Sequence, residues 1–494
     1  MDAAAGAQRP GAPRPGGSRT LVLHPDRLLP ADPAVRGIAR RLYDAVAGLP
    51  IVSPHGHLAP ALFVADEAIE DPGIVLVGED HYVVRLLHGR GVPLEQLLAG
   101  REDPPLSGRA LFAHLGAHWA ALGGTPSRLW LEQVLVEVFG AGTRPSPESA
   151  DALYDEIRAH LAARPLTPRG LLRRFGVEML STTDGALAPL EDHARLVADA
   201  DFPARLVPNF RPDDVCDPAA AGFPAACVRL GELAGRDTGS LAGFLDALRV
   251  RRQAFAATGA CASDHAVEVR TTERLGETAA ETLFLRCREG RGDASDAGAL
   301  AGHLLNECAA MAADDGWVMQ LHLGVERDYV AAVRARYGPD VGQDFPVATE
   351  YTRTLRPLLE RYGNSPRFRL VLHTVDETTF SREIGPLASY FPGVFAGAPW
   401  WFLDAPDAMG RALSALGETA GLTKLSGFVD DSRSLVSLGA RHDVARRVFC
   451  AHLARLVAEH RLETDEAEAG ARAFAYETPR RLFAVAETRA APAG

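Results

Sequence analysis

Short apolar runs rich in β-branched residues recur along the chain, and segments with helical spacing separate them. Clear helices are predicted over 241–258 and 349–362, where apolar residues repeat at intervals of three and four. Parallel strands buried on both faces read as continuous apolar runs joined by helical returns. Eight such units favour a closed (β/α)8 barrel of the TIM type over an open sheet. The eight predicted strands cover residues 49–53, 178–182, 205–209, 259–263, 317–322, 369–373, 394–398 and 424–429.

The return after the first predicted strand is much longer than one helix and covers about residues 59–176. Its pattern predicts several helices, which we expect to form a helical insertion beside the barrel mouth. The sequence at 146–148 supplies a serine N-cap and a proline for the first turn of one of them. Leu153, Ile157 and Leu161 fall on one face of that helix.

Composition sets the domain organisation and excludes some partners. The chain has 494 residues, 47% of them hydrophobic, so we predict one barrel domain over 21–487, between disordered tails at 1–20 and 488–494. The first tail lacks the apolar run of a signal peptide, and no segment is long and apolar enough to span a membrane. The net charge of -12 argues against a nucleic-acid partner but allows a small anionic substrate.

Cysteine and lysine usage narrows the chemistry. Six cysteines without a CxxC pair indicate neither a disulfide scaffold nor a thiolate zinc site, so we expect a cytoplasmic protein. Lys424 is the only lysine in the chain. A phosphate-binding loop that ends in Gly-Lys-Ser/Thr is therefore absent, and Schiff-base chemistry would have to use Lys424.

Polar residues follow the predicted strands at their carboxyl ends, where a (β/α)8 enzyme assembles its active site. Several histidines and carboxylates in these positions form an inventory typical of metal binding. In strand order, the residues are His55 and His57, Thr183 and Asp184, Asn209 and Arg211, Asp264 and His265, His322, His373, Trp400 and Trp401, and finally Asp430, Asp431 and Arg433.

His55 and His57 are two residues apart on an extended segment, so both imidazoles can point to the barrel axis and bind one ion. Alone, the pair could equally be two loop histidines in a turn. An acid after the eighth strand, which is the neighbour of the first in a closed barrel, favours the metal site. Asp431 is preferred to Asp430 as that acid, although the sequence does not fix which of the two faces inward.

The remaining aromatic and histidine positions keep two interpretations. His322 is either a further ligand or proton carrier, or a core histidine. His373 has the same position on the sixth strand and the same alternatives. Trp400 and Trp401 form an aromatic cluster at the mouth, and packing of a lid accounts for at least one of them.

An ordered set of segments resembles the uronate isomerases (glucuronate isomerases) of the amidohydrolase superfamily. The resemblance runs from about residue 21 to 485. One departure is the sixth strand, where the family usually shows Asn-Pro followed by Asp and this chain has HTVD at 373–376. The matching segments are HGH at 55–57, GEDHYVVR at 78–85, STTD at 181–184, PNFRPD at 208–213, SDH at 263–265, LHLG at 321–324, PWWFLD at 399–404 and DSRS at 431–434.

The resemblance implies reversible conversion of an aldose acid into its ketose acid, such as D-glucuronate to D-fructuronate or D-galacturonate to D-tagaturonate. It implies that His55, His57 and Asp431 hold a divalent ion, expected to be zinc. Asp431 would also take a hydroxyl proton during ring opening. His81 and Tyr82, from the insertion, would transfer protons and position the substrate.

For substrate binding, the resemblance implies a grip on the sugar carboxylate by Arg211 and Arg433, because a guanidinium can hold a carboxylate through two parallel hydrogen bonds. Trp400, Trp401 and His322 would complete the substrate site. The expected partner is a small sugar acid, and the sequence allows a homo-oligomer.

Two other functions compete. A mononuclear metal-dependent hydrolase or deaminase of the same superfamily would use the HxH pair with His322, His373 and Asp431, and the HTVD segment strengthens this alternative. A lysine-bridged metal pair is disfavoured because the fourth strand has no lysine. A non-catalytic barrel would predict a loss of metal ligands, yet all of them are present. We therefore expect an aldose-ketose isomerase.

Overall fold

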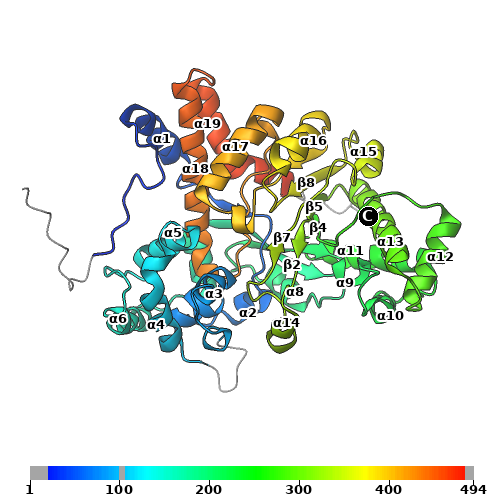
Figure 1. Cartoon of the computed structure of the whole chain (residues 1–494), viewed down its shortest axis with the longest axis horizontal. Helices are drawn as coiled ribbons and strands as arrows, with labels where there is room; N and C mark the ends of the chain where they lie inside the picture. Colours follow the sequence, from blue (N-terminus) through cyan, green and yellow to red (C-terminus); the bar gives the residue numbers. More distant parts are fainter. Residues whose placement is uncertain (1–19, 99–105, 484–494) are drawn as a thin grey trace, which may run out of the picture.

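The computed structural model describes residues 20–98 and 106–483. In this part of the chain, seven parallel strands form one curled sheet with the order β1-β2-β3-β4-β5-β8-β9, and helices lie outside it (Figure 1). Seven of the eight predicted runs are therefore strands. Their bounds are β1 Ile51–Ser53, β2 Val177–Gly185, β3 Arg205–Arg211, β4 Ala262–His265, β5 Val318–His322, β8 Arg369–His373 and β9 Val394–Ala396.

The prediction of a regular eighth strand at 424–429 was wrong. Only Leu425 pairs with β9, through a single parallel bridge to Ala396. Gly427 interrupts the extended conformation because its φ is 95° and it packs against the ring of Pro479. The segment still fills the position between β9 and β1, since the carbonyl of Ser432 accepts a hydrogen bond from the backbone N–H of His57 at 3.0 Å.

The interior of the barrel is packed at the amino ends of the strands. Apolar side chains from successive strands meet there. Helix α20 (Thr478–Phe483) packs against them with Leu482 and Phe483. Chemistry is thus confined to the carboxyl ends. The layer comprises Val52, Met179, Val207, Cys261, Ala262, Val318, Val371, Leu482 and Phe483.

Several helices begin at a residue whose side chain caps the first turn. In the longest of them, α13, Asp293 and Asp296 form a capping box and Gly316, at φ 72°, ends the helix. The predicted helix 241–258 is confirmed as α11. The outer and terminal helices are α1 Pro33–Val46, α8 Glu191–Ala198, α9 Asp213–Cys216, α10 Phe223–Ala234, α11 Leu241–Ala257, α12 Glu277–Arg288, α13 Ala294–Asp315, α15 Arg356–Tyr362, α16 Gly385–Tyr390, α17 Pro406–Ala420, α18 Leu438–Ala458 and α19 Thr464–Arg472.

The helix predicted over 349–362 is shorter than expected, because only Arg356–Tyr362 is helical. Acidic side chains from the segment after β8 bind backbone N–H groups of residues 349–352. The Glu383 carboxylate accepts from Tyr351 and Thr352, and Asp376 accepts from Thr349. These contacts hold residues 349–352 against the segment after β8 and outside the helix.

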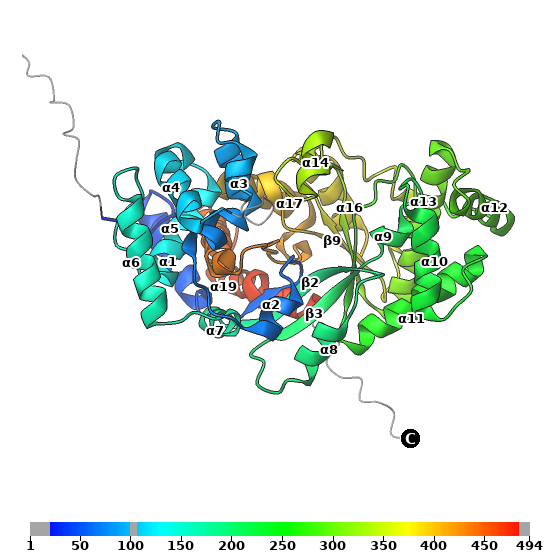
Figure 2. The same ribbon diagram turned by 90° about the horizontal axis from the view of Figure 1, so that it is seen from below.

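Six α-helices occupy the described part of the long return between β1 and β2, and they gather on one side of the barrel (Figures 1 and 2). Within α6, Leu153, Ile157 and Leu161 are buried, as the pattern predicts. The predicted start at 146–148 was wrong, since these residues form a turn held by the Ser146 and Ser149 hydroxyls. The helices are α2 Pro60–Ala65, α3 His81–His88, α4 Gly108–His118, α5 Pro126–Gln133, α6 Ala150–Ala163 and α7 Pro168–Phe175.

A second excursion, residues 323–349, follows β5. It contains a two-stranded antiparallel ribbon, β6 (Val325–Glu326) with β7 (Phe345–Pro346), and helix α14 (Ala331–Tyr337) between them. Its turn at Gly342 packs against α3: a Cβ at Gly342 would lie 2.9 Å from the His81 carbonyl oxygen. The excursion therefore lies beside the mouth of the barrel.

The predicted tails, 1–20 and 488–494, lie outside the described residues except for Thr20, which makes an antiparallel bridge to Thr143. Within residues 20–98 and 106–483, no helix has both the length and the apolarity needed to cross a bilayer.

Candidate metal centre and active site

His55, His57 and Asp431 converge at the carboxyl end of the barrel. The Oδ1 atom of Asp431 lies 3.2 Å from Nε2 of His55 and 3.0 Å from Nε2 of His57. Both Asp431 oxygens are buried and have no hydrogen-bond partner among the described residues. A buried carboxylate that faces two imidazoles in this way has the donor set of a divalent metal site, so the three side chains could hold such an ion.

The two adjacent acids after the eighth segment face different surroundings. Asp431 has a φ of 45°, a left-handed conformation that is uncommon for a residue other than glycine. Asp430 turns instead toward the hydroxyl of Ser53 and the imidazole of His442, and its side chain also accepts from the backbone N–H of Ser432. Asp430 thus anchors the segment while Asp431 meets the histidines.

The protonation states of Asp431 and His57 favour metal binding. Burial and the neighbouring Arg433 lower the pKa of His57 to about 4. For Asp431, burial raises the pKa, but the two histidines outweigh this effect and hold it well below the ordinary value. At neutral pH the carboxylate is charged and His57 is neutral, which are the forms that coordinate a metal.

A second group of possible ligands adjoins the first. Asp264 lies between His55, whose Nδ1 is 3.8 Å away, and His322, whose Nδ1–H donates to Oδ1 at 2.5 Å. Asp264 is fully buried, and His322, Arg211 and His55 together hold its pKa well below the ordinary value despite that burial. His55, Asp264 and His322 could therefore take part in the same ion site.

His373 does not reach this group through a free nitrogen. Its ring stacks on His322 at a centroid distance of 4.2 Å. Its Nδ1 lies 3.2 Å from the carbonyl oxygen of Ala398, and its Nε2 lies 3.2 Å from the side-chain oxygen of Gln320. The structure thus places His373 behind His322 as a buried supporting ring.

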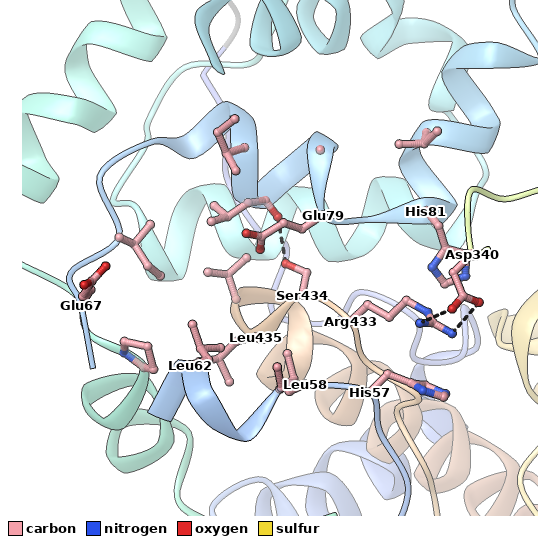
Figure 3. A pocket seen from close by; sticks show the side chains of 18 of the residues that line it. His57, Leu58, Leu62, Glu67, Glu79, His81, Asp340, Arg433, Ser434 and Leu435 are labelled. Atoms are coloured by element: carbon pink, nitrogen blue, oxygen red, sulfur yellow. Dashed lines mark hydrogen bonds and ion pairs between the residues drawn. The ribbon is translucent and has the colours of Figure 1, made fainter. Parts of the chain in front are cut away.

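The two candidate arginines have different partners. Arg211 donates to Asp213 at 2.8 Å and lies 3.2 Å from the buried carboxylate of Asp264. Arg433 instead lines a cavity of about 740 Å³ together with His57 and His81 (Figure 3). Its two terminal nitrogens pair with the carboxylate of Asp340, at 3.2 and 3.1 Å.

His81 and Tyr82 open helix α3, and Asp80 caps it by accepting from the Tyr82 N–H. His81 lines the cavity, and its Nδ1 has no hydrogen-bond partner among the described residues. Burial and Arg433 lower the pKa of His81 well below the ordinary value, so the imidazole is neutral. Tyr82 lies behind His81 with its ring centroid 4.5 Å away and is almost fully buried.

Both tryptophans are buried. Trp400 meets His322 edge to face at 4.8 Å, and Trp401 stacks on Trp400 at 5.0 Å. Trp401 has a φ of 51° and also contacts His81, at 6.1 Å between ring centroids. Neither indole lines the large cavity, so the pair forms packed support behind the two histidines.

Two charged residues of the site were missed at the sequence level. Asp340, which pairs with Arg433, lies in the excursion after β5, where only Gly338 and Gly342 mark a turn. Arg441 is buried in helix α18, donates to the Asp430 carbonyl and lies over the Tyr82 ring. Arg441 is one of four arginines in α18, so nothing local in the sequence distinguished it.

Comparison with known sequences identifies relatives over most of the chain. The family model described as glucuronate isomerase matches residues 34–483. A uronate isomerase of Rhizorhabdus wittichii is 47% identical over 447 residues, which cover 90% of this chain and 95% of that protein. Another, from Xanthomonas campestris pv. campestris, is 44% identical over 466 residues, which cover 94% of this chain and 99% of the relative.

Solved structures show the same architecture. The crystal structure of glucuronate isomerase from Caulobacter crescentus has a TM-score of 0.92 and 40% identity, and the match covers 96% of this chain and 100% of that one. Uronate isomerase from Thermotoga maritima gives a TM-score of 0.87 at 30% identity, covering 94% of this chain and 99% of the other. These matches confirm the predicted (β/α)8 fold and the predicted resemblance. The chain belongs to the glucuronate isomerase family.

Proposed function

We propose that this protein is a metal-dependent uronate isomerase that interconverts an aldose acid and its ketose acid, either D-glucuronate and D-fructuronate or D-galacturonate and D-tagaturonate. One observation carries the proposal. A single cavity presents His57 of the His/Asp group, the neutral base His81 and the cation Arg433. Isomerisation of a sugar acid needs these three components: a site for an electrophile, a base, and a grip on the carboxylate.

We assign His55, His57 and Asp431 to a zinc ion, because zinc accepts imidazole nitrogen and carboxylate oxygen as ligands. When bound, zinc would act as a Lewis acid toward substrate oxygens. Asp431 would accept the proton of the sugar hydroxyl during ring opening. Arg211 would keep Asp264 charged beside His55 and His322 through its 3.2 Å contact.

His81 is the proposed base for the carbon-bound proton. Its neutral imidazole in the cavity can remove the proton from C2 of the open-chain aldose and return it to C1 through an enediol. The electron pair of the C2–H bond forms the C1–C2 double bond while O1 takes a proton, which gives the enediol. O2 then loses its proton as the carbonyl forms at C2, and the proton on His81 goes to C1. Tyr82 and Trp401, which contact the His81 ring, would hold it in place.

Arg433 is the proposed partner of the substrate carboxylate. It lines the cavity, whereas Arg211 already pairs with both Asp213 and Asp264. Trp400 and His322 would then support the substrate site, because their edge-to-face contact lies behind the residues that line the cavity.

The hydrolase or deaminase alternative is not favoured. It would use His373, and both nitrogens of that ring already contact protein atoms. The relatives that cover most of the chain are uronate isomerases.

The test is turnover of a panel of uronates by protein whose metal content has been measured. We expect ¹³C NMR to show the ketose acid as product. In deuterated water, the carbon next to the new carbonyl should gain deuterium to the extent that the proton on His81 exchanges with solvent. Hydrolysis of an amide, a lactone or an aminopurine with no uronate turnover would contradict the proposal.

A further inference from the structure

Asp340 occupies the fork of Arg433. Its Oδ2 and Oδ1 atoms lie 3.2 Å from Nη1 and 3.1 Å from Nη2, and both residues line the large cavity (Figure 3). The paired N–H groups of a guanidinium match the two oxygens of a carboxylate and bind it through two parallel hydrogen bonds. A carboxylate of the protein therefore sits where the proposed function places the carboxylate of the substrate.

The backbone around Asp340 aims it at this position. Asp340 has a φ of 60° and Gly342 one of 85°, so the chain turns sharply at 338–342. The next residue after Asp340, Val341, is buried against the cavity. Gly342 approaches the His81 carbonyl so closely that a Cβ there would lie at 2.9 Å. The turn thus packs the excursion after β5 against α3, the helix that carries the proposed base His81.

We infer that Asp340 is an internal competitor for the substrate carboxylate, and hence a specificity-determining residue; the inference rests on the proposed function. A uronate replaces Asp340 on the Arg433 fork, and the turn at 338–342 loosens as it binds. A neutral sugar lacks a group that can displace Asp340, so this end of the cavity remains closed to it.

Displacement fits the geometry better than a role in which Asp340 only orients Arg433. With the fork occupied, a substrate would be left with Nε of Arg433, which is buried and has no hydrogen-bond partner in the described part of the chain. A single N–H holds a carboxylate less well than the fork does. The side chain of Asp340 is 35% exposed, so water can hydrate its carboxylate once the substrate has taken its place on Arg433.

The decisive variant is Asp340→Asn. Asparagine tolerates a left-handed backbone conformation, so the turn should survive. The affinity of a site is reduced in proportion to the fraction of molecules in which it is open. Removing the competing charge should lower KM for the uronate by about threefold to tenfold, with kcat within about twofold. In an Arg433→Met background, the same substitution should leave KM unchanged.

A matched control separates this contact from general repulsion of an anion. Glu326 is an exposed carboxylate of the same excursion and lies outside the cavity. We expect Glu326→Gln to keep KM at the wild-type value. An increase or no change in KM for Asp340→Asn, or an equal decrease for Glu326→Gln, would overturn the inference.

Hydrogen exchange tests the displacement without turnover. D-gluconate is a sugar acid without a carbonyl to isomerise. At saturation, it should speed amide exchange at 338–342 in the wild type. Asp340→Asn should exchange rapidly at these positions with or without D-gluconate. Bound D-gluconate with unchanged exchange in the wild type would overturn the inference, whereas failure of every uronate to react would count against the proposed function only.

Discussion

Removal of His55 and His57 together would leave Asp431 as a buried carboxylate with no opposing imidazole. We expect His55→Ala with His57→Ala to reduce bound metal from about one ion per chain to near zero, and uronate turnover with it, because two of three proposed ligands are gone. Elemental analysis and circular dichroism would check metal content and fold. His24→Ala, at an exposed histidine, is the control; stoichiometric metal in the double variant would place the site elsewhere.

At the residue scale, the sequence could predict which side chains lie at the site but not which of their atoms contact one another. His55 and His57 were predictable because side chains two apart on an extended segment share a face. The choice between Asp430 and Asp431 depends on the φ of 45° at Asp431, which no local pattern reports. Asp340 pairs with a residue 93 positions away, so its role depends wholly on the tertiary fold.

At the element scale, Lys424 fastens the eighth segment to the start of β9. Its ammonium donates to the carbonyls of Phe391, Pro392 and Val394, at 2.9, 3.0 and 2.9 Å. These atoms lie at the amino ends of the strands, opposite the metal centre. The only lysine of the chain is therefore a structural tie and lies away from the proposed chemistry.

The Lys424→Met variant should lower the free energy of unfolding by about 1 to 2 kcal/mol, because three carbonyls lose a charged donor that is only partly buried. Its kcat/KM should stay within about twofold of the wild type. Urea unfolding and steady-state kinetics would measure both, with exposed Thr423→Ala as the neighbouring control. Loss of all activity in a folded, metal-loaded variant would instead give Lys424 a chemical role.

The same segment shows why seven strands were predictable and the eighth was not. An apolar run predicts burial, and residues 424–429 are apolar enough to be buried like the other runs. A regular ladder also needs extended backbone at every position, and Gly427, at a φ of 95°, breaks it. The helix start expected at 146–148 failed for a similar reason, since serine hydroxyls can cap a turn as well as a helix.

At the scale of the whole molecule, the barrel is polarised. Apolar side chains and α20 fill the amino ends of the strands, whereas buried charges and histidines fill the carboxyl ends. The hydrophobic pattern predicted this division, because the division depends on continuous apolar runs and on the polar residues that follow each run. The cavity could not be predicted, since it lies between the insertion, the excursion after β5 and the eighth segment, which are distant in sequence.

One buried histidine lies away from the polar carboxyl ends of the strands. His452 lies in α18, outside the metal centre, and is 8% exposed. Burial, together with the nearby Arg455 and Arg461, lowers its pKa from 6.5 to about 4. Between these pH values, the unfolded chain binds a proton at His452 that the folded chain does not. The free energy of unfolding must therefore fall as the pH falls from 6.5 toward 4.

Replacing His452 with glutamine should remove this part of the acid sensitivity. One proton contributes at most about 1.4 kcal/mol per pH unit, so between pH 7 and pH 5 the variant should lose about 1 to 2 kcal/mol less stability than the wild type. Urea titrations at both pH values give this double difference, in which any equal effect of metal release cancels. His24→Gln, at an exposed histidine, should follow the wild type. If His452→Gln loses as much stability as the wild type, His452 does not limit stability in acid, and the proton uptake must come from other buried groups such as His265, whose pKa burial lowers to about 3.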